Sequence, residues 1–315
     1  MIAFGPVPSR RLGQSLGINN IPPKICTYSC VYCQLGRTHI LQVSPTQFYE
    51  PEKVFNAAKT KVQNVLAKKD TIDYITIVPD GEPTLDQNLG THIDLLKELG
   101  IKIAVITNAS LLWDTKIQNN LAQADWVSVK IDAVTPKAWR TINRPHTHLD
   151  LDTILKGIKT FSKVYTAELT TETMVVQGIN DSEPELKKIR DFIHGITPSK
   201  SYVAIPTRPP AEPWVTPPSE QTITTAYHLF AEKITTVEYL IGYEGNEFAF
   251  TGNVKEDLLS ITSVHPMREE GVKKFLSKAH AGWDIITQLI DAGDMTEVVY
   301  KDKKYYMRTL PDTPC

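Results

Sequence analysis

The sequence has no apolar run long enough to span a bilayer, no excess of positive charge and no low-complexity tract. The first absence argues against a membrane-spanning protein. The second, with 34 Lys and Arg against 36 Asp and Glu, removes the strong positive field that holds many proteins to nucleic acid. The remaining composition, 41% hydrophobic and 22% charged over 315 residues, suffices for one large globular domain and a smaller one.

Cysteine is also scarce, with four residues in the whole chain. Three of them, Cys26, Cys30 and Cys33, fall within eight positions, and the fourth, Cys315, is the last residue. A disulfide framework would be spread along the chain, so this distribution argues against one. Clustered cysteines in a cytosolic protein usually bind a metal or react.

The N-terminal segment carries a twin arginine at positions 10 and 11, which is one feature of an export signal. No apolar stretch follows it, and an export signal needs one. We therefore expect a cytoplasmic protein without a membrane partner.

Strand-like and helix-like segments alternate along the first two thirds of the chain. Expected strands cover 15–19, 74–78, 101–107, 126–131, 169–176 and 202–205, and expected helices cover 52–68, 88–99, 114–124, 152–162 and 183–194. This alternation predicts right-handed βαβ units around a parallel sheet that is buried on both faces. The expected fold class is α/β, an open (β/α)6 partial TIM barrel, with the active site at the C-terminal ends of the strands.

Residues 207–220, TRPPAEPWVTPPSE, contain five prolines and predict a linker or strap. A helix over 221–233 and a strand over 237–243 are expected next. From residue 254 the pattern indicates three helices and a hairpin, the order of a winged helix-turn-helix. We therefore expect three parts: a partial barrel over 1–206, a proline-rich linker over 207–220, and a C-terminal α+β module over 221–315 with a winged-helix-like end.

The three clustered cysteines lie on one short loop directly after the first expected strand. Thiolates in this number suit an iron–sulfur cluster, in which three ligands leave the fourth iron open for chemistry. Structural zinc is the main alternative, but it needs a fourth ligand, and only His39 is close in sequence. A redox dithiol is a weaker alternative because it leaves one thiol unexplained.

The run from Cys26 to Cys33, CTYSCVYC, resembles the signature loop of the radical S-adenosylmethionine (SAM) superfamily, with Tyr32 as the aromatic residue before the last cysteine. The resemblance implies that Cys26, Cys30 and Cys33 hold a [4Fe–4S] cluster. It also implies that SAM binds the open iron through its methionine amino and carboxylate groups, with Tyr32 near the adenine.

A second motif follows the expected strand at 74–78. Residues 80–84, DGEPT, resemble the GGEP-type motif of the superfamily, with Asp80 in place of the first glycine. The resemblance implies cofactor binding by Gly81, Glu82 and Pro83, with the methionine amino group received by the backbone and by Glu82. The structural alternative is a tight turn before a helix, for which glycine and proline are sufficient.

Three more strand ends complete the expected site. Thr107 and Asn108 match a motif near the ribose or carboxylate of SAM, and Gln177 is expected to touch the adenine. Lys130 and Asp132 lie two positions apart on one strand face, and the superfamily often has a charged pair there, so we expect them to be catalytic. The structural alternatives are helix capping by Asn108 and an ion pair between Lys130 and Asp132.

Other segments indicate one particular family within the superfamily. The opening residues 5–13, the run 36–38 and the GIN-IPPK sequence before the first cysteine resemble one uncharacterised radical SAM family, UPF0026. That family is related to the tRNA wyosine-base synthases and, distantly, to the nitrogenase cofactor protein NifB. Arg144 and Arg208 are expected near the mouth of the barrel, either holding a phosphate or carboxylate of the substrate or as solvated loop residues.

The resemblance implies reductive cleavage of SAM. A flavodoxin- or ferredoxin-type donor would reduce the cluster, the C5′–S bond would break, and a 5′-deoxyadenosyl radical would remove hydrogen from a substrate. Modification of an RNA base is one expected outcome, and a metabolite is another substrate class. Archaeal wyosine synthases carry extra N-terminal cysteines for a second cluster, whereas only Cys315 is left over here.

Two other functions stay open at this point, a protein-radical activase and an iron–sulfur DNA-binding regulator. Residues 253–315 contain nine Lys and Arg against ten Asp and Glu, although Lys301, Lys303 and Lys304 cluster on the expected hairpin. A DNA reader normally needs a basic surface, so this balance argues against the regulator. We expect the C-terminal module to be dispensable for SAM cleavage and needed for the substrate.

Overall fold

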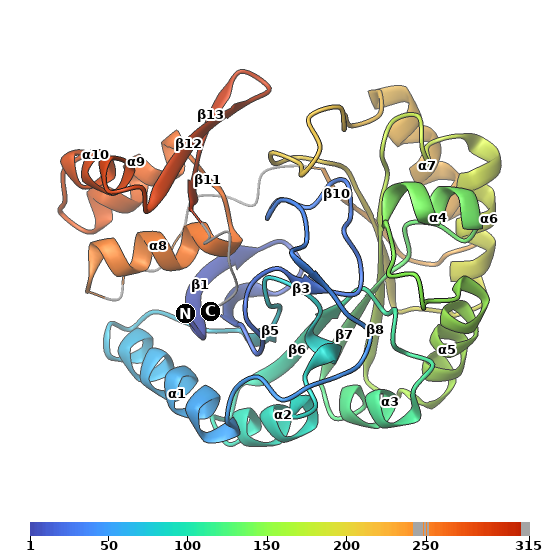
Figure 1. Ribbon diagram of the computed structural model, residues 1–315, viewed down its shortest axis with the longest axis horizontal. Coiled ribbons are helices and arrows are strands. Elements are labelled where there is room, and N and C mark those ends of the chain that lie inside the picture. The colour runs from blue at the N-terminus through green and yellow to red at the C-terminus, as the bar shows by residue number, and fades with distance from the viewer. Residues whose placement is uncertain (242–247, 249, 251, 310–315) are drawn as a thin grey trace.

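The computed structural model describes residues 1–241, 248, 250 and 252–309, and a curled eight-stranded sheet lies at its centre (Figure 1). The strands lie in the order β1-β2-β5-β6-β7-β8-β9-β10. Neighbouring strands from β2 onward are parallel, whereas β1 is an antiparallel edge strand. The bounds are β1 Ala3–Ser9, β2 Gly13–Ile18, β5 Tyr74–Ile77, β6 Lys102–Thr107, β7 Trp126–Lys130, β8 Glu168–Met174, β9 Lys200–Ala204 and β10 Val237–Leu240.

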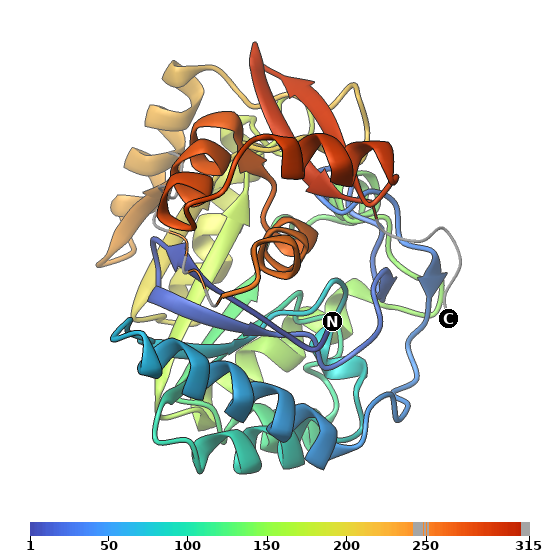
Figure 2. The ribbon, with the colours of Figure 1, turned by 90° about the vertical axis from the view of Figure 1, so that its left-hand side faces the viewer.

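Helices connect the parallel strands and lie along the outer face of the sheet (Figures 1 and 2). This arrangement brings the carboxyl ends of all the parallel strands to one edge of the sheet. The helices are α1 Pro51–Ala67, α2 Leu89–Lys97, α3 Thr115–Leu121, α4 Pro136–Ile142, α5 Leu151–Val164, α6 Glu183–His194 and α7 Glu220–Ala231. Short elements in the connecting loops are β3 Ile25–Cys26, β4 Ile40–Leu41 and the 3-10 helix η1 Pro83–Leu85.

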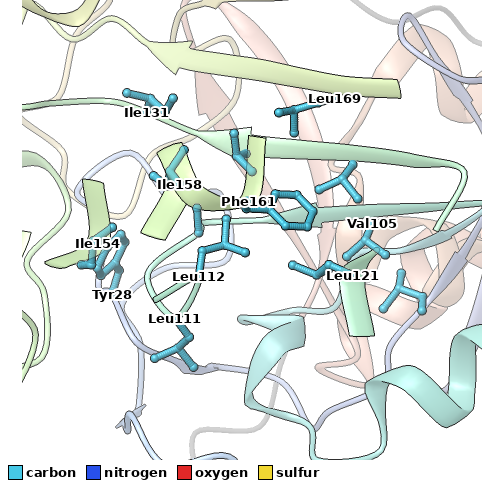
Figure 3. Close-up of a cluster of buried hydrophobic side chains, with 14 of the residues drawn as sticks. Tyr28, Val105, Leu111, Leu112, Leu121, Ile131, Ile154, Ile158, Phe161 and Leu169 are labelled. Atoms are coloured by element: carbon cyan, nitrogen blue, oxygen red, sulfur yellow. The ribbon is translucent and has the colours of Figure 1, made fainter. Parts of the chain in front are cut away.

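The main hydrophobic core fills the space between the sheet and these helices (Figure 3). On α5, Ile154, Ile158 and Phe161 recur at helical spacing and are almost fully buried. They belong to the same cluster as Val105 of β6 and Leu169 of β8. The amphipathic pattern of α5 therefore docks this helix on the outside of the sheet and leaves the strand ends for other residues.

The expected alternation is confirmed, but the sheet is larger than the (β/α)6 expectation. The six expected strands are present with ends shifted by at most two residues, and β10 makes a seventh parallel strand. The edge strand β1, with sequence AFGPVPS, was not expected because proline cannot donate to a strand ladder. An edge position tolerates proline. The expected strand 237–243 ends at Leu240 within the described residues, and 242 and 243 lie outside them.

The proline-rich segment 207–220 packs across the barrel as a strap. Val215 is fully buried, the Glu212 backbone N–H donates to Val31 O at 3.1 Å, and Thr216 O accepts from Gln177 N at 3.1 Å. Helix α7 and strand β10 follow the strap and extend the barrel sheet. The barrel therefore continues beyond residue 206, and the expected start of a separate module at 221 falls inside it.

The elements from residue 252 onward surround a second hydrophobic core. They are α8 Val254–Val264, β11 Met267–Arg268, α9 Glu269–Lys278, α10 Asp284–Asp291, β12 Met295–Tyr300 and β13 Lys303–Arg308, with the strands in the antiparallel order β11-β13-β12. We call residues 252–309 the C-terminal unit. Figures 1 and 2 show it beside β1, and a buried Lys61–Asp257 ion pair of 2.9 Å joins α1 to α8.

Across the described part of the chain, no helix combines the length and the apolar character needed to cross a membrane.

Candidate active site

A cavity of about 310 Å³ opens at the carboxyl ends of the barrel strands. The cysteine loop, the β5–η1 turn and the ends of β6, β7, β8 and β9 all contribute to its wall. Most of the residues that we expected in the site line it. These are Cys26, Cys30, Cys33, Tyr32, Gly81, Glu82, Thr107, Asn108 and Lys130.

The cysteine loop is held in place by the segment that follows α4. The Ser29 and Val31 backbone N–H groups donate to Asn143 O and Ile142 O at 3.0 and 2.9 Å. The Trp139 indole N–H donates to the Tyr28 hydroxyl at 3.1 Å. The end of α4 and the residues directly after it, including Arg144 that we had expected at the mouth, therefore support the cysteine loop.

The three thiols are half-buried and free of disulfides. Burial raises the pKa of the Cys26 and Cys33 thiols and raises the pKa of the Cys30 thiol to about 12. Side-chain amides contact two of them, with Asn108 Nδ2 3.5 Å from Cys26 Sγ and Asn143 Nδ2 3.4 Å from Cys30 Sγ. The loop thus presents sulfur ligands whose neighbours are hydrogen-bond donors.

Among the described residues, no group of three or more His, Cys, Asp or Glu side chains is already arranged around a metal position. His39, the candidate fourth zinc ligand, is exposed, and its Nε2 lies 3.3 Å from Lys24 Nζ. The donor chemistry nevertheless fits an iron–sulfur cluster, because three cysteines from one loop line a single cavity.

The turn after β5 packs directly against the cysteine loop. A Cβ on Gly81 would meet the Ile25 carbonyl oxygen at 2.0 Å, so only glycine fits there. The Asp80 carbonyl accepts from Lys24 N at 2.6 Å, which fixes the turn against the segment entering the loop. This close approach places the DGEP turn and the cysteines on one wall and suits a ligand that contacts both.

Glu82 is 1% exposed, and protein donors surround its carboxylate. Its Oε1 accepts from the Thr107 and Thr84 hydroxyls, both at 2.6 Å, and from Thr84 N at 3.1 Å. Its Oε2 accepts from Asn108 N at 2.7 Å. Burial raises the pKa of Glu82, and these hydrogen bonds act in the opposite direction. Glu82 therefore ties the DGEP turn to the end of β6.

The structure pairs Lys130 with Glu172 of β8, at 2.8 Å, rather than with Asp132. Arg11 also donates to the Glu172 carboxylate. Burial opposes ionisation of Glu172, but the two cations outweigh it and lower its pKa to about 2. Sequence reasoning missed Glu172; an acidic residue inside an expected buried strand was a usable signal, but its register with Lys130 is seen only in the structure.

Asp132 lies behind the cavity wall, because β7 ends at Lys130 and the alternation of strand faces stops there. Its carboxylate accepts from the Tyr32 hydroxyl, from Asn143 Nδ2 at 2.8 Å and from Met174 N at 2.9 Å. The Lys130 ammonium lies 5.1 Å from the centre of the Tyr32 ring. Asp132 thus fixes the orientation of Tyr32.

Two other expected residues also lie outside the cavity wall. Gln177 is exposed and bonds to Thr216 of the strap, and Pro83 is buried, with its carbonyl accepting from Asn20 Nδ2 at 3.1 Å. Arg208 does line the cavity. Arg144 instead donates to Glu212 of the strap at 2.5 Å.

The C-terminal unit also contacts the cavity wall. The Tyr300 and Tyr305 hydroxyls donate to Pro206 O and Thr207 O at 3.2 and 3.0 Å. The guanidinium of Arg208 bonds Gln34, directly after Cys33, at 2.6 Å and lies 2.9 Å from His265 Nδ1.

Comparisons with known proteins agree with this fold. The family model for the radical SAM superfamily matches residues 20–188. The UPF0026 protein of Methanocaldococcus jannaschii is 45% identical over 311 residues, which cover 98% of this chain and 96% of that protein.

Two solved structures share the fold. A radical SAM methyltransferase from Sphaerobacter thermophilus aligns with a TM-score of 0.56 and 13% identity, over 72% of this chain and 66% of the other. A structure of TYW1 with a lysine–pyruvate adduct bound aligns with a TM-score of 0.51 and 16% identity, over 71% and 76%. The half-barrel, the cysteine loop and these matches together make this chain a member of the radical SAM superfamily and, within it, of the UPF0026 family.

Proposed function

We propose that this radical SAM enzyme holds a [4Fe–4S] cluster through Cys26, Cys30 and Cys33 and binds SAM in the same cavity, beside Gly81 and Glu82. The observation that carries the proposal is that the three thiols and the DGEP turn line one cavity. When bound, the two groups supply one-electron cleavage of SAM and hydrogen abstraction from a substrate. The residues of the chain orient both groups and exclude water from them.

Asn108 joins the two halves of the proposed site. Its backbone N–H donates to Glu82, and its side-chain amide donates to Thr27 at 2.8 Å and contacts Cys26. The cysteine loop and the DGEP turn are therefore held in a fixed position relative to each other. Tyr32, fixed by Asp132, offers a flat ring on which the adenine can stack.

For the substrate we propose an RNA base that is held in part through its phosphate. Five cationic side chains and three carboxyl groups line the cavity, and one carboxylate is shared by two of the cations. This balance favours an anionic substrate. A protein-radical activase is the alternative, and the positive charge gives it no support. The cations are Arg10, Arg11, Lys24, Lys130 and Arg208, and the carboxyl groups are Asp80, Glu82 and Glu172.

We also propose that the C-terminal unit is winged-helix-like and presents a large partner to the cavity. Its helix–strand–helix–helix–hairpin order and its β11-β13-β12 sheet support this relation. Lys301, Lys303 and Lys304 are exposed on the hairpin. The even charge of the segment as a whole favours contacts with a structured partner over a DNA-binding regulator.

The remaining partners follow from the proposed chemistry. Reduction of the cluster calls for a low-potential donor, and we propose a flavodoxin- or ferredoxin-type protein. A cytoplasmic location agrees with the absence of a disulfide framework in the sequence.

The substrate class can be tested by tracing hydrogen. Reconstituted enzyme, SAM and reductant would be mixed with deuterated RNA, protein or metabolite fractions from cells that lack this enzyme. The proposal predicts that deuterium appears in 5′-deoxyadenosine with the RNA fraction. Deuterium transfer from the protein fraction alone would support the activase instead.

A further inference from the structure

Two segments of the chain carry basic residues without any acidic ones. Residues 1–49 contain four Lys and Arg and no Asp or Glu, and residues 137–149 contain three Lys and Arg and no Asp or Glu. The whole chain has 36 acidic residues against 34 basic ones. Positive charge is therefore concentrated in these two segments and is not a property of the protein as a whole.

The structure brings the two segments together at the cysteine loop. The His146 backbone N–H donates to Thr27 O at 2.9 Å, which joins the second segment to the loop. Arg37 comes shortly after the cysteines, and it shares the carboxylate of Glu212 with Arg144, at 2.7 and 2.5 Å. Basic side chains from both segments are therefore held next to each other beside the loop.

These basic side chains are accessible and lie outside the cavity wall. The side chains of Arg37 and Arg144 are 69% and 36% exposed, whereas that of Glu212 is 5% exposed. Lys137 and Arg140 are exposed on α4, the helix whose end supports the loop. We call Arg37, Lys137, Arg140 and Arg144 the basic patch, and none of the four is among the residues that line the cavity.

The position of the basic patch suits a partner that must reach the cluster and not the substrate. In the proposed function SAM and the substrate occupy the cavity, so the cavity side of the cysteine loop is taken. Electron transfer between proteins requires the donor to dock close to the acceptor group. A protein that docks on the basic patch lies against the cysteine loop without entering the cavity.

We propose that the basic patch is the docking surface for an acidic electron donor of the flavodoxin or ferredoxin type. This inference rests on the proposed function, because it assumes a cluster on the three cysteines. Opposite charges speed the encounter of two proteins, and redox partners need only a small contact area. Trp214 of the strap, 52% exposed and two residues from Glu212, adds an aromatic side chain of the kind enriched in protein interfaces. One electron leaves the donor, the oxidised cluster gains it, and no bond forms or breaks.

The test measures how fast an acidic flavodoxin in its fully reduced form reduces the anaerobically reconstituted holoenzyme in the presence of SAM. Arg37→Gln/Arg140→Gln removes two charges from the basic patch and leaves Arg144 bonded to Glu212. Reduction should be about 3- to 10-fold slower at low ionic strength, and the difference should shrink at high salt. The dissociation constant for oxidised flavodoxin should rise by a similar factor. Reduction by photoreduced deazaflavin, a small molecule that needs no docking surface, should be unchanged.

Lys97→Gln/Lys116→Gln is the matched control, because it removes the same number of charges from exposed positions on α2 and α3. It should leave the flavodoxin rate unchanged. Equal slowing in the control would reduce the effect to net charge and overturn the inference. Slower reduction of the patch variant by deazaflavin as well would overturn it, because the basic patch would then act on the cluster itself.

Two further outcomes separate this inference from the proposed function. A flavodoxin rate that is equal in the patch variant and the wild type would overturn the inference and leave the proposed function standing. If the same variant also bound tRNA more weakly, the basic patch would belong to the RNA substrate instead. A wild type whose cluster neither reductant reduces would overturn the inference and the proposed function together.

Discussion

Burial raises the pKa of the Asp80 carboxyl group to about 7, well above its ordinary value of 3.8. The group therefore lowers the stability of the ligand-free protein at neutral pH. Below about pH 4 it is protonated in the folded and unfolded chains alike, and it costs nothing. As the pH rises from about 4 to 7, only the unfolded chain loses the proton, so folding becomes less favourable.

Asp80→Asn should therefore stabilise the ligand-free protein increasingly between pH 5 and pH 8, by an amount on the order of a few kcal/mol at the upper end. Thermal unfolding of both proteins across this range measures the difference. A gain in Tm that does not depend on pH would contradict the ionisation account.

At the residue scale, the sequence predicted which loop and strand-end residues line the cavity. It predicted their hydrogen-bond and ion-pair partners less well. The cysteines, Glu82, Thr107 and Asn108 converge as expected because parallel strands end at one edge. The Lys130–Asp132 pair did not form because β7 stops at Lys130, and spacing along the chain cannot reveal that Glu172 comes from the next strand. In the sequence Asp80 is only a departure from a glycine motif. The structure is needed to show that its Oδ1 is buried without a hydrogen-bond partner among the described residues.

The segment after α4 is the element that supports the cysteine loop. Asn143 is 4% exposed, and its side-chain amide donates to Asp132 and contacts Cys30. Asn143→Ala should leave Asp132 with one donor fewer and remove the amide that contacts Cys30, while the backbone hydrogen bonds to the cysteine loop remain. We expect faster loss of iron from the reconstituted protein, measured by release to a chelator. We expect only a small change in Tm.

A matched control is Gln118→Ala. Gln118 is a similarly buried amide that donates to Leu112 O at 2.6 Å and lies on α3, away from the loop. It should lower the stability and leave the rate of iron release unchanged. Equal iron release from both variants would mean that Asn143 acts only through general stability.

The sequence predicted helices correctly where their hydrophobic periodicity was strong. Helix α6 is an example, because both of its ends match the expected range. Strand β1 was missed because its prolines weaken the strand pattern. The short helix α4, which begins at Pro136, was missed as well. Strand β10 was expected as a strand, but not as part of the barrel, since the five prolines before it suggested a boundary.

At the scale of the whole molecule, the C-terminal unit contacts residues that line the cavity and is not a remote attachment. Tyr300 and Tyr305 bond the backbone of residues 206 and 207, which line the cavity. The double variant Tyr300→Phe/Tyr305→Phe removes both bonds and keeps the rings. We expect a stable protein in which substrate-free SAM cleavage falls, measured as 5′-deoxyadenosine formed with a chemical reductant.

This experiment also tests our expectation from sequence that the C-terminal module is dispensable for SAM cleavage. A chain cut near residue 220 is a poor test, because it removes α7 and β10 from the barrel sheet. An unchanged cleavage rate in the double variant would support dispensability. A lower rate at an unchanged iron content would assign the unit a part in shaping the cavity.

We propose that this fold uses its three clustered cysteines to hold a cluster that cleaves SAM. The most direct measurement is the iron, sulfide and zinc content of anaerobically prepared protein, together with 5′-deoxyadenosine formation, in the wild type and in Cys30→Ala. The account predicts about four irons and four sulfides per chain and reductant-dependent cleavage in the wild type, with cleavage abolished in the variant. Stoichiometric zinc without sulfide in the wild type would contradict it.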